Sequence, residues 1–192
     1  CKYSYVCSSG TAAIHLAMLS INLKKDDIIL MPAVNFVASY NMAKTMQLNI
    51  YLVDVDIHTG QITPDKVLEC IKKNKLKKIK ALILMYHGGY PENIKEFYDL
   101  KKKYKFFIIE DACHALGSGY EYKNKSFKIG SCKHADISTF SLHPLKTITS
   151  GEGGIITTNN YKIAKAIKLF RSHGILRNKK QHWKYDILKH GF

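Results

Sequence analysis

Three short stretches of the chain hold residues whose types and spacing could perform chemistry. The first is Ser8-Ser9-Gly10-Thr11, which stands immediately before a predicted helix. Free N–H groups and the dipole at a helix start attract a phosphate, and glycine lets a ligand approach the backbone closely. The stretch matches neither the Walker pattern nor the GxGxxG dinucleotide pattern. It therefore predicts either a phosphate site or a plain helix cap.

The second stretch runs from Glu110 to Ala115 and follows the apolar run KFFII. A carboxylate at the end of a buried strand, here Asp111, binds a cation or orients a ligand nitrogen; the alternative is a cap or a surface turn. Cys113 beside His114 could suggest a nucleophile, but neighbours in an extended segment point to opposite faces. The five cysteines form no CxxC pair, so we expect neither disulfides nor a metal site.

The third stretch contains Lys146, in a loop that follows a predicted strand and precedes the glycine run 151–154. A partly desolvated lysine is the usual Schiff-base nucleophile. The alternative is one more surface lysine in a lysine-rich chain. A phosphate cup, an acid at a strand end and an amine in a loop together form the set that pyridoxal phosphate (PLP) requires.

The elements that must position these residues alternate along the whole chain. Apolar periodicity and cap signals predict helices over 11–22, 35–47, 64–73, 92–103 and 161–171, and strands over 27–31, 49–54, 80–86, 105–110, 135–141 and 154–158. This alternation predicts an α/β fold, a mostly parallel sheet with helices on both faces. Ligands bind beyond the carboxyl ends of such strands, where Asp111 and Ser141 are expected.

Composition indicates one globular domain with a real core, since 46% of the 192 residues are hydrophobic. The net charge of +15 comes almost entirely from lysine, because Arg171 and Arg177 are the only arginines. Nucleic-acid readers rely on arginine, so we expect a solvated lysine surface and no nucleic-acid partner. No apolar run approaches a membrane span and no secretory signal is visible, which predicts a cytoplasmic protein without a membrane partner.

Taken together, these residues and the stretches around them resemble those of the DegT-like, fold-type I PLP-dependent aminotransferases that act on keto sugars attached to nucleotides. The matching stretches follow the family's order and spacing: 8–17, 32–39, 53–62, 110–118, 139–158 and 169–175. The resemblance implies that Lys146 forms the Schiff base with PLP and serves as the proton-transfer base. It also implies that Asp111 pairs with the pyridine nitrogen.

The same resemblance assigns the remaining cofactor contacts. Gly10, Thr11 and Ser141 would hold the phosphate, with Ser9 close by. Phe36 stands where an aromatic ring stacks on the cofactor, the alternative being a core phenylalanine inside a helix. His114 occupies the position that contacts the cofactor's ring hydroxyl or face.

Within the family, the pattern SxHPxKxITxGEGG followed by RSHGI and by WxYD resembles the transaminases of pseudaminic acid biosynthesis. That implies transfer of an amino group from glutamate to the 4-keto position of a UDP-linked 6-deoxy-N-acetylhexosamine. Alternatives are an aminoarabinose or perosamine type of sugar-nucleotide aminotransferase, or a catalytically inactive fragment. One branch of the family replaces the lysine by histidine and dehydrates its substrate; Lys146 argues against that branch.

The resemblance also bears on domain organisation and assembly. Family members carry a segment before the equivalent of residue 2 and a small C-terminal domain after the large one. We therefore expect residues 1–192 to be a partial large PLP-binding domain, with the N-terminal segment and the small C-terminal domain absent from this chain. A homodimer is implied, because the family's sites are completed across a subunit interface.

Overall fold

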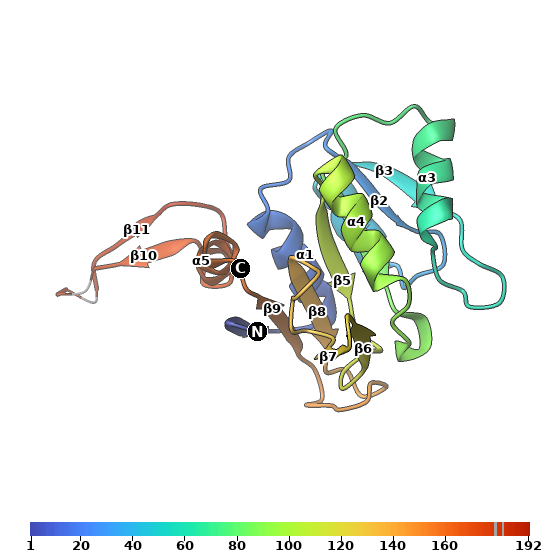
Figure 1. Cartoon of the computed structure of the whole chain (residues 1–192). Helices are drawn as coiled ribbons and strands as arrows, with labels where there is room; N and C mark the ends of the chain where they lie inside the picture. Colours follow the sequence, from blue (N-terminus) through green and yellow to red (C-terminus); the bar gives the residue numbers. More distant parts are fainter. Residues whose placement is uncertain (179, 182) are drawn as a thin grey trace.

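A seven-stranded sheet forms the centre of the molecule, as a computed structural model describing residues 1–178, 180–181 and 183–192 shows (Figure 1). The strand order is β1-β9-β8-β5-β4-β2-β3. The strands are β1 Tyr3–Cys7, β2 Ile28–Pro32, β3 Asn49–Val53, β4 Ala81–Met85, β5 Phe107–Asp111, β8 Ile137–Ser141 and β9 Gly154–Thr158. Neighbours from β3 through β8 pair in parallel, whereas β9 runs antiparallel to β8 and to β1. The predicted mostly parallel sheet is confirmed.

Helices cover both faces of this sheet, as predicted. One face packs against α1 Gly10–Ser20, α2 Ala38–Thr45 and α5 Tyr161–Phe170, with an apolar cluster that includes Ile14, Met18 and Ile167. The other face packs against α3 Pro64–Lys73 and α4 Ile94–Tyr104. All five residues of β4 are buried, as a strand covered on both faces requires.

Side-chain caps fix where several helices begin. The Ser9 hydroxyl accepts a hydrogen bond from the Ala12 N–H at the start of α1, and Thr63 accepts one from the Lys66 N–H at the start of α3. Pro64 then occupies the first helical position, where a missing N–H costs nothing. The start of α1 lies next to the end of β8, since Gly10 is in close contact with Ser141.

The helix expected over 35–47 starts later than predicted. Helix α2 begins at Ala38, so Asn35 and Phe36 lie in the loop after β2. Val37 at the cap position offers no side-chain hydrogen bond. Apolar periodicity reports which positions face the core, but no cap residue marks this helix start, which explains the shift.

Five strands of the described chain were not predicted from the sequence. They are β1 at the sheet edge, the hairpin of β6 Gly119–Tyr122 with β7 Lys125–Lys128, and the hairpin of β10 Ile175–Arg177 with β11 Tyr185–Ile187. None contains a buried apolar run, the feature that marks central strands. The β10–β11 hairpin extends from α5 away from the sheet (Figure 1). Within the described residues, no helix has both the length and the apolar character to cross a membrane.

Candidate active site

A cavity of about 690 Å³ opens at the carboxyl ends of β5 and β8, beside the start of α1. It brings together all eight residues that the sequence singled out: Ser9, Gly10, Thr11, Phe36, Asp111, His114, Ser141 and Lys146. Asn35, Met85, Cys113, His143, Leu145 and Glu152 also line it. Its position at the carboxyl edge of a parallel sheet is where α/β proteins bind ligands.

The start of α1 forms one end of the cavity. A Cβ atom at position 10 would lie 2.8 Å from the Cβ of Ser141, so only glycine lets the helix start approach the end of β8 this closely. The Ser9 hydroxyl is used as the helix cap, which confirms the capping interpretation for that side chain. The N–H groups of Gly10 and Thr11 belong to the first turn, where the helix itself supplies no acceptors. No acidic residue stands in that turn, so it suits an anion.

Asp111, the last residue of β5, presents a buried carboxylate to the cavity, with 3% of its surface exposed. Two donors approach it from the protein side. The Ser39 hydroxyl lies 3.4 Å from Oδ2, and the Cys113 N–H donates to Oδ1 at 3.4 Å. Both carboxylate oxygens are therefore oriented by the protein.

The neighbouring acid, Glu110, points to the opposite face of the sheet, as residues in a strand alternate. Its carboxylate accepts hydrogen bonds from the Tyr86 hydroxyl, at 2.8 Å, and from the Ser138 hydroxyl. Burial raises the pKa of Glu110, while these two donors oppose the rise. Of the two adjacent acids, Asp111 alone lines the cavity.

Lys146 is partly buried in the loop between β8 and β9, and it lines the cavity. The loop is folded back on itself, since the Lys146 N–H donates to the His143 carbonyl and the Ser150 N–H donates to the Leu142 carbonyl. The Leu145 N–H donates to His143 Nδ1 at 3.2 Å. These hydrogen bonds fix the backbone of the loop and therefore the point from which the Lys146 side chain extends.

Cys113 and His114 both line the cavity, so the expectation that they face opposite sides is wrong. They lie in a turn after β5, where the alternation of an extended strand does not apply. Burial, reinforced by the nearby Asp111 carboxylate, raises the pKa of the Cys113 thiol well above its usual range, which leaves it protonated and a poor nucleophile. Burial and then the Lys146 charge lower the pKa of His114, which favours a neutral imidazole.

Phe36 stands at the cavity wall with 71% of its surface exposed, so it is not a core residue of a helix. Next to it, both polar atoms of the Asn35 side chain are buried without a hydrogen-bond partner. Asn35 and Ser39 were missed by the sequence reasoning, although both lie in the stretch 32–39 that carries the resemblance. Their residue types did not mark them as site residues, because Asn and Ser are common in loops and at helix starts.

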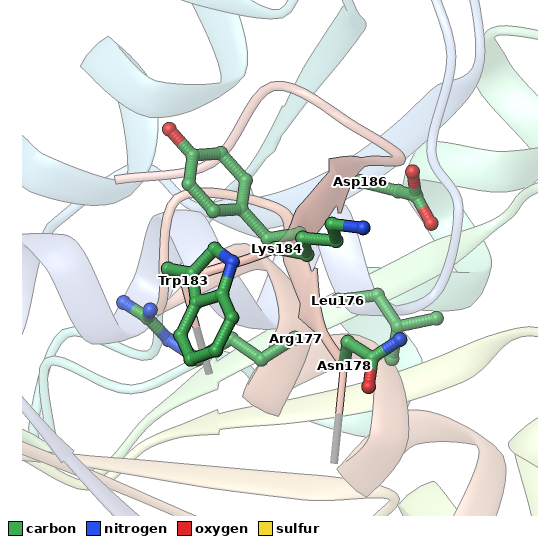
Figure 2. A pocket seen from close by; sticks show the side chains of 7 residues that line it. Leu176, Arg177, Asn178, Trp183, Lys184 and Asp186 are labelled. Atoms are coloured by element: carbon green, nitrogen blue, oxygen red, sulfur yellow. The ribbon is translucent and has the colours of Figure 1, made fainter. Parts of the chain in front are cut away.

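A second hollow, of about 540 Å³, lies on the β10–β11 hairpin and is shown in Figure 2. It is lined by Leu176, Arg177, Asn178, Trp183, Lys184, Tyr185 and Asp186. None of the eight predicted site residues is among them. In the described part of the chain, no group of three or more His, Cys, Asp or Glu side chains is arranged to hold a metal ion.

Comparison with known proteins shows a match to one protein family and similarity to several named proteins. The model of the DegT/DnrJ/EryC1/StrS aminotransferase family matches residues 1–192. A UDP-4-amino-4,6-dideoxy-N-acetyl-beta-L-altrosamine transaminase from Campylobacter jejuni is 38% identical over 191 residues, which is 100% of this chain and 48% of the relative. A GDP-perosamine synthase from Escherichia coli O157:H7 is 31% identical over 191 residues, 100% of this chain and 49% of the relative.

Solved structures share the fold. NtdA from Bacillus subtilis, with bound cofactor PMP, superposes with a TM-score of 0.83 at 29% identity, covering 99% of this chain and 40% of that one. Helicobacter pylori PseC, an aminotransferase involved in the biosynthesis of pseudoaminic acid, gives a TM-score of 0.84 at 28% identity, covering 100% and 48%. The chain thus spans about half the length of the curated relatives that it matches.

Proposed function

The chain belongs to the DegT/DnrJ/EryC1/StrS aminotransferase family, and on this premise we propose that it is the cofactor-binding domain of a PLP-dependent sugar-nucleotide transaminase. The observation that carries the proposal is the convergence of a helix start, a buried carboxylate and a lysine in one cavity. We assign residues 1–192 to the large PLP-binding domain.

The residues of the cavity fit PLP. The phosphate would lie at the start of α1, where Gly10 keeps the backbone open and the first helical turn contains no acidic residue. The buried carboxylate of Asp111 suits a protonated ring nitrogen. The buried, unpartnered amide of Asn35 is a further sign of a binding site, since such groups normally find a partner. The volume lies within the range of ordinary small-molecule sites.

When bound, PLP supplies an electron-accepting ring that stabilises negative charge on the reacting carbon. The N–H groups of Gly10 and Thr11 and the hydroxyl of Ser141 would bind its phosphate. Asp111 would hold the ring nitrogen in its protonated form by charge and hydrogen bonding. Lys146 would hold the cofactor covalently and then move a proton with its freed Nζ amine.

Two further side chains would limit how the cofactor's ring moves. His114, whose pKa is lowered chiefly by burial, offers a ring face or a ring nitrogen to the cofactor. Phe36, at the cavity wall, offers an aromatic surface for stacking. Phe36 lies in the loop that follows β2, and His114 lies in the turn that follows β5.

For the substrate, we propose glutamate as amino donor and a UDP-linked 4-keto-6-deoxy-N-acetylhexosamine as acceptor, as in pseudaminic acid biosynthesis. The name of the 38%-identical Campylobacter relative and the description of Helicobacter PseC support this choice. The 31%-identical GDP-perosamine synthase supports a second candidate, a GDP-linked keto sugar. None of these three proteins is named for aminoarabinose, so their names give no support to that alternative. The convergence of the cavity residues argues against the other alternative, a catalytically inactive fragment.

We also propose that the natural protein is a homodimer, as the family's subunit-completed sites imply. The β10–β11 hairpin offers an apolar surface for such contact. Its side chains Leu176, Tyr185 and Ile187 are 56%, 51% and 70% exposed.

The test is to purify the natural protein that contains this chain and to record its visible absorbance with PLP. Borohydride reduction followed by peptide mapping should then place the cofactor on Lys146. Replacing this lysine, Lys146→Ala, should abolish the covalent link and lower transamination by roughly 10³-fold or more. Lys162→Ala, an exposed lysine of α5, serves as the control and should behave like wild type.

Glutamate with UDP-linked and GDP-linked 4-keto sugars, followed by mass spectrometry of the products, should distinguish the two substrate candidates. Amination of the UDP-linked sugar alone supports the first proposal. A wild-type protein that binds no PLP, or a Lys146→Ala variant that keeps full turnover, would contradict the function.

A further inference from the structure

The Asp111 carboxylate accepts hydrogen bonds from two donors that belong to separate parts of the fold. Ser39, from the first turn of α2, places its hydroxyl 3.4 Å from Oδ2. The N–H of Cys113, in the turn after β5, donates to Oδ1 at 3.4 Å. Ser39 has no exposed surface and Asp111 is 3% exposed, so water does not compete for these contacts.

The hydroxyl of Ser39 is not used in the way that serine hydroxyls near helix starts usually are. Such hydroxyls cap the helix or bond back to a carbonyl of the previous turn. Ser20, at the end of α1, does the latter, since its hydroxyl donates to the Ala17 carbonyl at 2.8 Å. Ser39 instead reaches a carboxylate 72 residues further along the chain.

This contact has a chemical consequence. A hydrogen bond donated to each carboxylate oxygen fixes how the group is turned toward the cavity. A neutral hydroxyl supplies that bond without adding a positive charge that would compete for the carboxylate. With one protein donor on each oxygen, the remaining lone pairs of Asp111 are available to the cavity that it lines.

We infer that Ser39 is a positioning residue: it orients the Asp111 carboxylate, so that Asp111 can hold the protonated ring nitrogen of PLP. The inference rests on the proposed function. Ser39 does not line the cavity itself and acts only through Asp111.

The experiment compares Ser39→Ala with Ser20→Ala, which removes a different buried helical hydroxyl remote from the carboxylate. Each is made in the natural protein and titrated with PLP carrying an isotope-labelled ring nitrogen. The readouts are the PLP dissociation constant, the NMR shift of the ring nitrogen, kcat, and the thermal midpoint without cofactor.

Ser39→Ala should weaken PLP binding roughly tenfold, lower kcat, and move the ring-nitrogen signal toward that of unprotonated pyridine. Ser39→Cys, a weaker donor of similar size, should fall between wild type and alanine. Ser20→Ala should change only the thermal midpoint.

Wild-type affinity and an unchanged nitrogen signal in Ser39→Ala would overturn the inference and leave the proposed function intact. Equal losses of cofactor affinity in Ser39→Ala and Ser20→Ala would also overturn it, because both would then reflect general destabilisation. Failure of the wild-type protein to bind PLP would instead overturn the proposed function, and this inference with it.

Discussion

Single residues decide how closely the backbone can approach a bound phosphate. At position 10 the Cβ of any other residue would meet the Cβ of Ser141 at 2.8 Å, closer than side-chain atoms pack. Gly10→Ala should therefore push the start of α1 away from β8, destabilise the fold by about 1–3 kcal/mol and weaken PLP binding at least tenfold. Chemical unfolding and PLP titration would measure both effects.

A compensating substitution tests whether that steric contact is the cause. Ser141→Gly removes the Cβ that the new methyl group would meet. The double variant Gly10→Ala/Ser141→Gly should recover a large part of the unfolding free energy lost in the single variant. Additive losses in the double variant would refute the steric explanation.

The adjacent acids Glu110 and Asp111 show how position on a strand divides similar residues. Glu110 bonds to Tyr86 and Ser138 on one face, and Asp111 meets Ser39 and the cavity on the other. The two carboxylates therefore have separate environments despite being neighbours in the chain.

At the scale of elements, a buried histidine holds the β6–β7 hairpin against α4. His134, 5% exposed, accepts or donates at 2.7 Å with the Tyr120 hydroxyl. Its ring packs edge-on against Tyr98 of α4, Tyr122 of β6 and Phe127 of β7. Burial, followed by the charges of Lys133 and Lys102, lowers the pKa of His134 in the folded protein.

This lowered pKa predicts acid sensitivity. The unfolded chain binds a proton at an ordinary histidine pKa of about 6.5, whereas the folded protein resists protonation. The stability that His134 contributes is thus present above about pH 6.5 and is lost as the pH falls toward its folded pKa. Unfolding free energies measured between about pH 7.5 and about pH 5.5 should decrease with acidification.

Replacing the ring identifies the source of that decrease. His134→Phe keeps an aromatic ring in the hairpin contact but cannot be protonated, so it should show a smaller decrease than wild type. Part of the decrease should persist, because burial also lowers the pKa of His15 and of His114. Exposed His58, changed to Asn, is the control and should keep the wild-type slope. A full wild-type slope in His134→Phe would exclude His134 as a contributor.

At the scale of the whole molecule, the β10–β11 hairpin extends away from the sheet (Figure 1). It carries exposed apolar side chains, among them Leu176 and Ile187. If the proposed dimer uses this hairpin, Ile187→Lys should raise the dimer dissociation constant at least tenfold, since it places a charge in an apolar contact. Sedimentation equilibrium of the natural protein would measure it.

The same substitution at an exposed isoleucine outside the hairpin tests whether the effect of Ile187→Lys is specific to the hairpin. Ile57 is 89% exposed and lies outside the hairpin, so Ile57→Lys should leave the dissociation constant unchanged. Equal dissociation constants for wild type and Ile187→Lys would exclude this side chain from the subunit contact.

The class of fold and eight of the cavity residues could be predicted from the sequence. Fully buried strands such as β4 read as continuous apolar runs, and their alternation with helices dictates a mostly parallel sheet. The order and spacing of the motifs indicated the family, and eight residues chosen from them meet in one cavity.

Other contacts between residues distant in sequence are visible only in the tertiary structure. That Ser39 contacts Asp111, that Phe36 is exposed at the cavity wall, and that His134 packs against a hairpin are not visible in any local pattern. Periodicity reports the side of an element that faces the core, whereas partners distant in sequence are set by strand order and by where each helix starts. Helix α2 starts three residues later than its apolar pattern suggests, and that start places Phe36 in the loop and Ser39 in the first turn, beside Asp111.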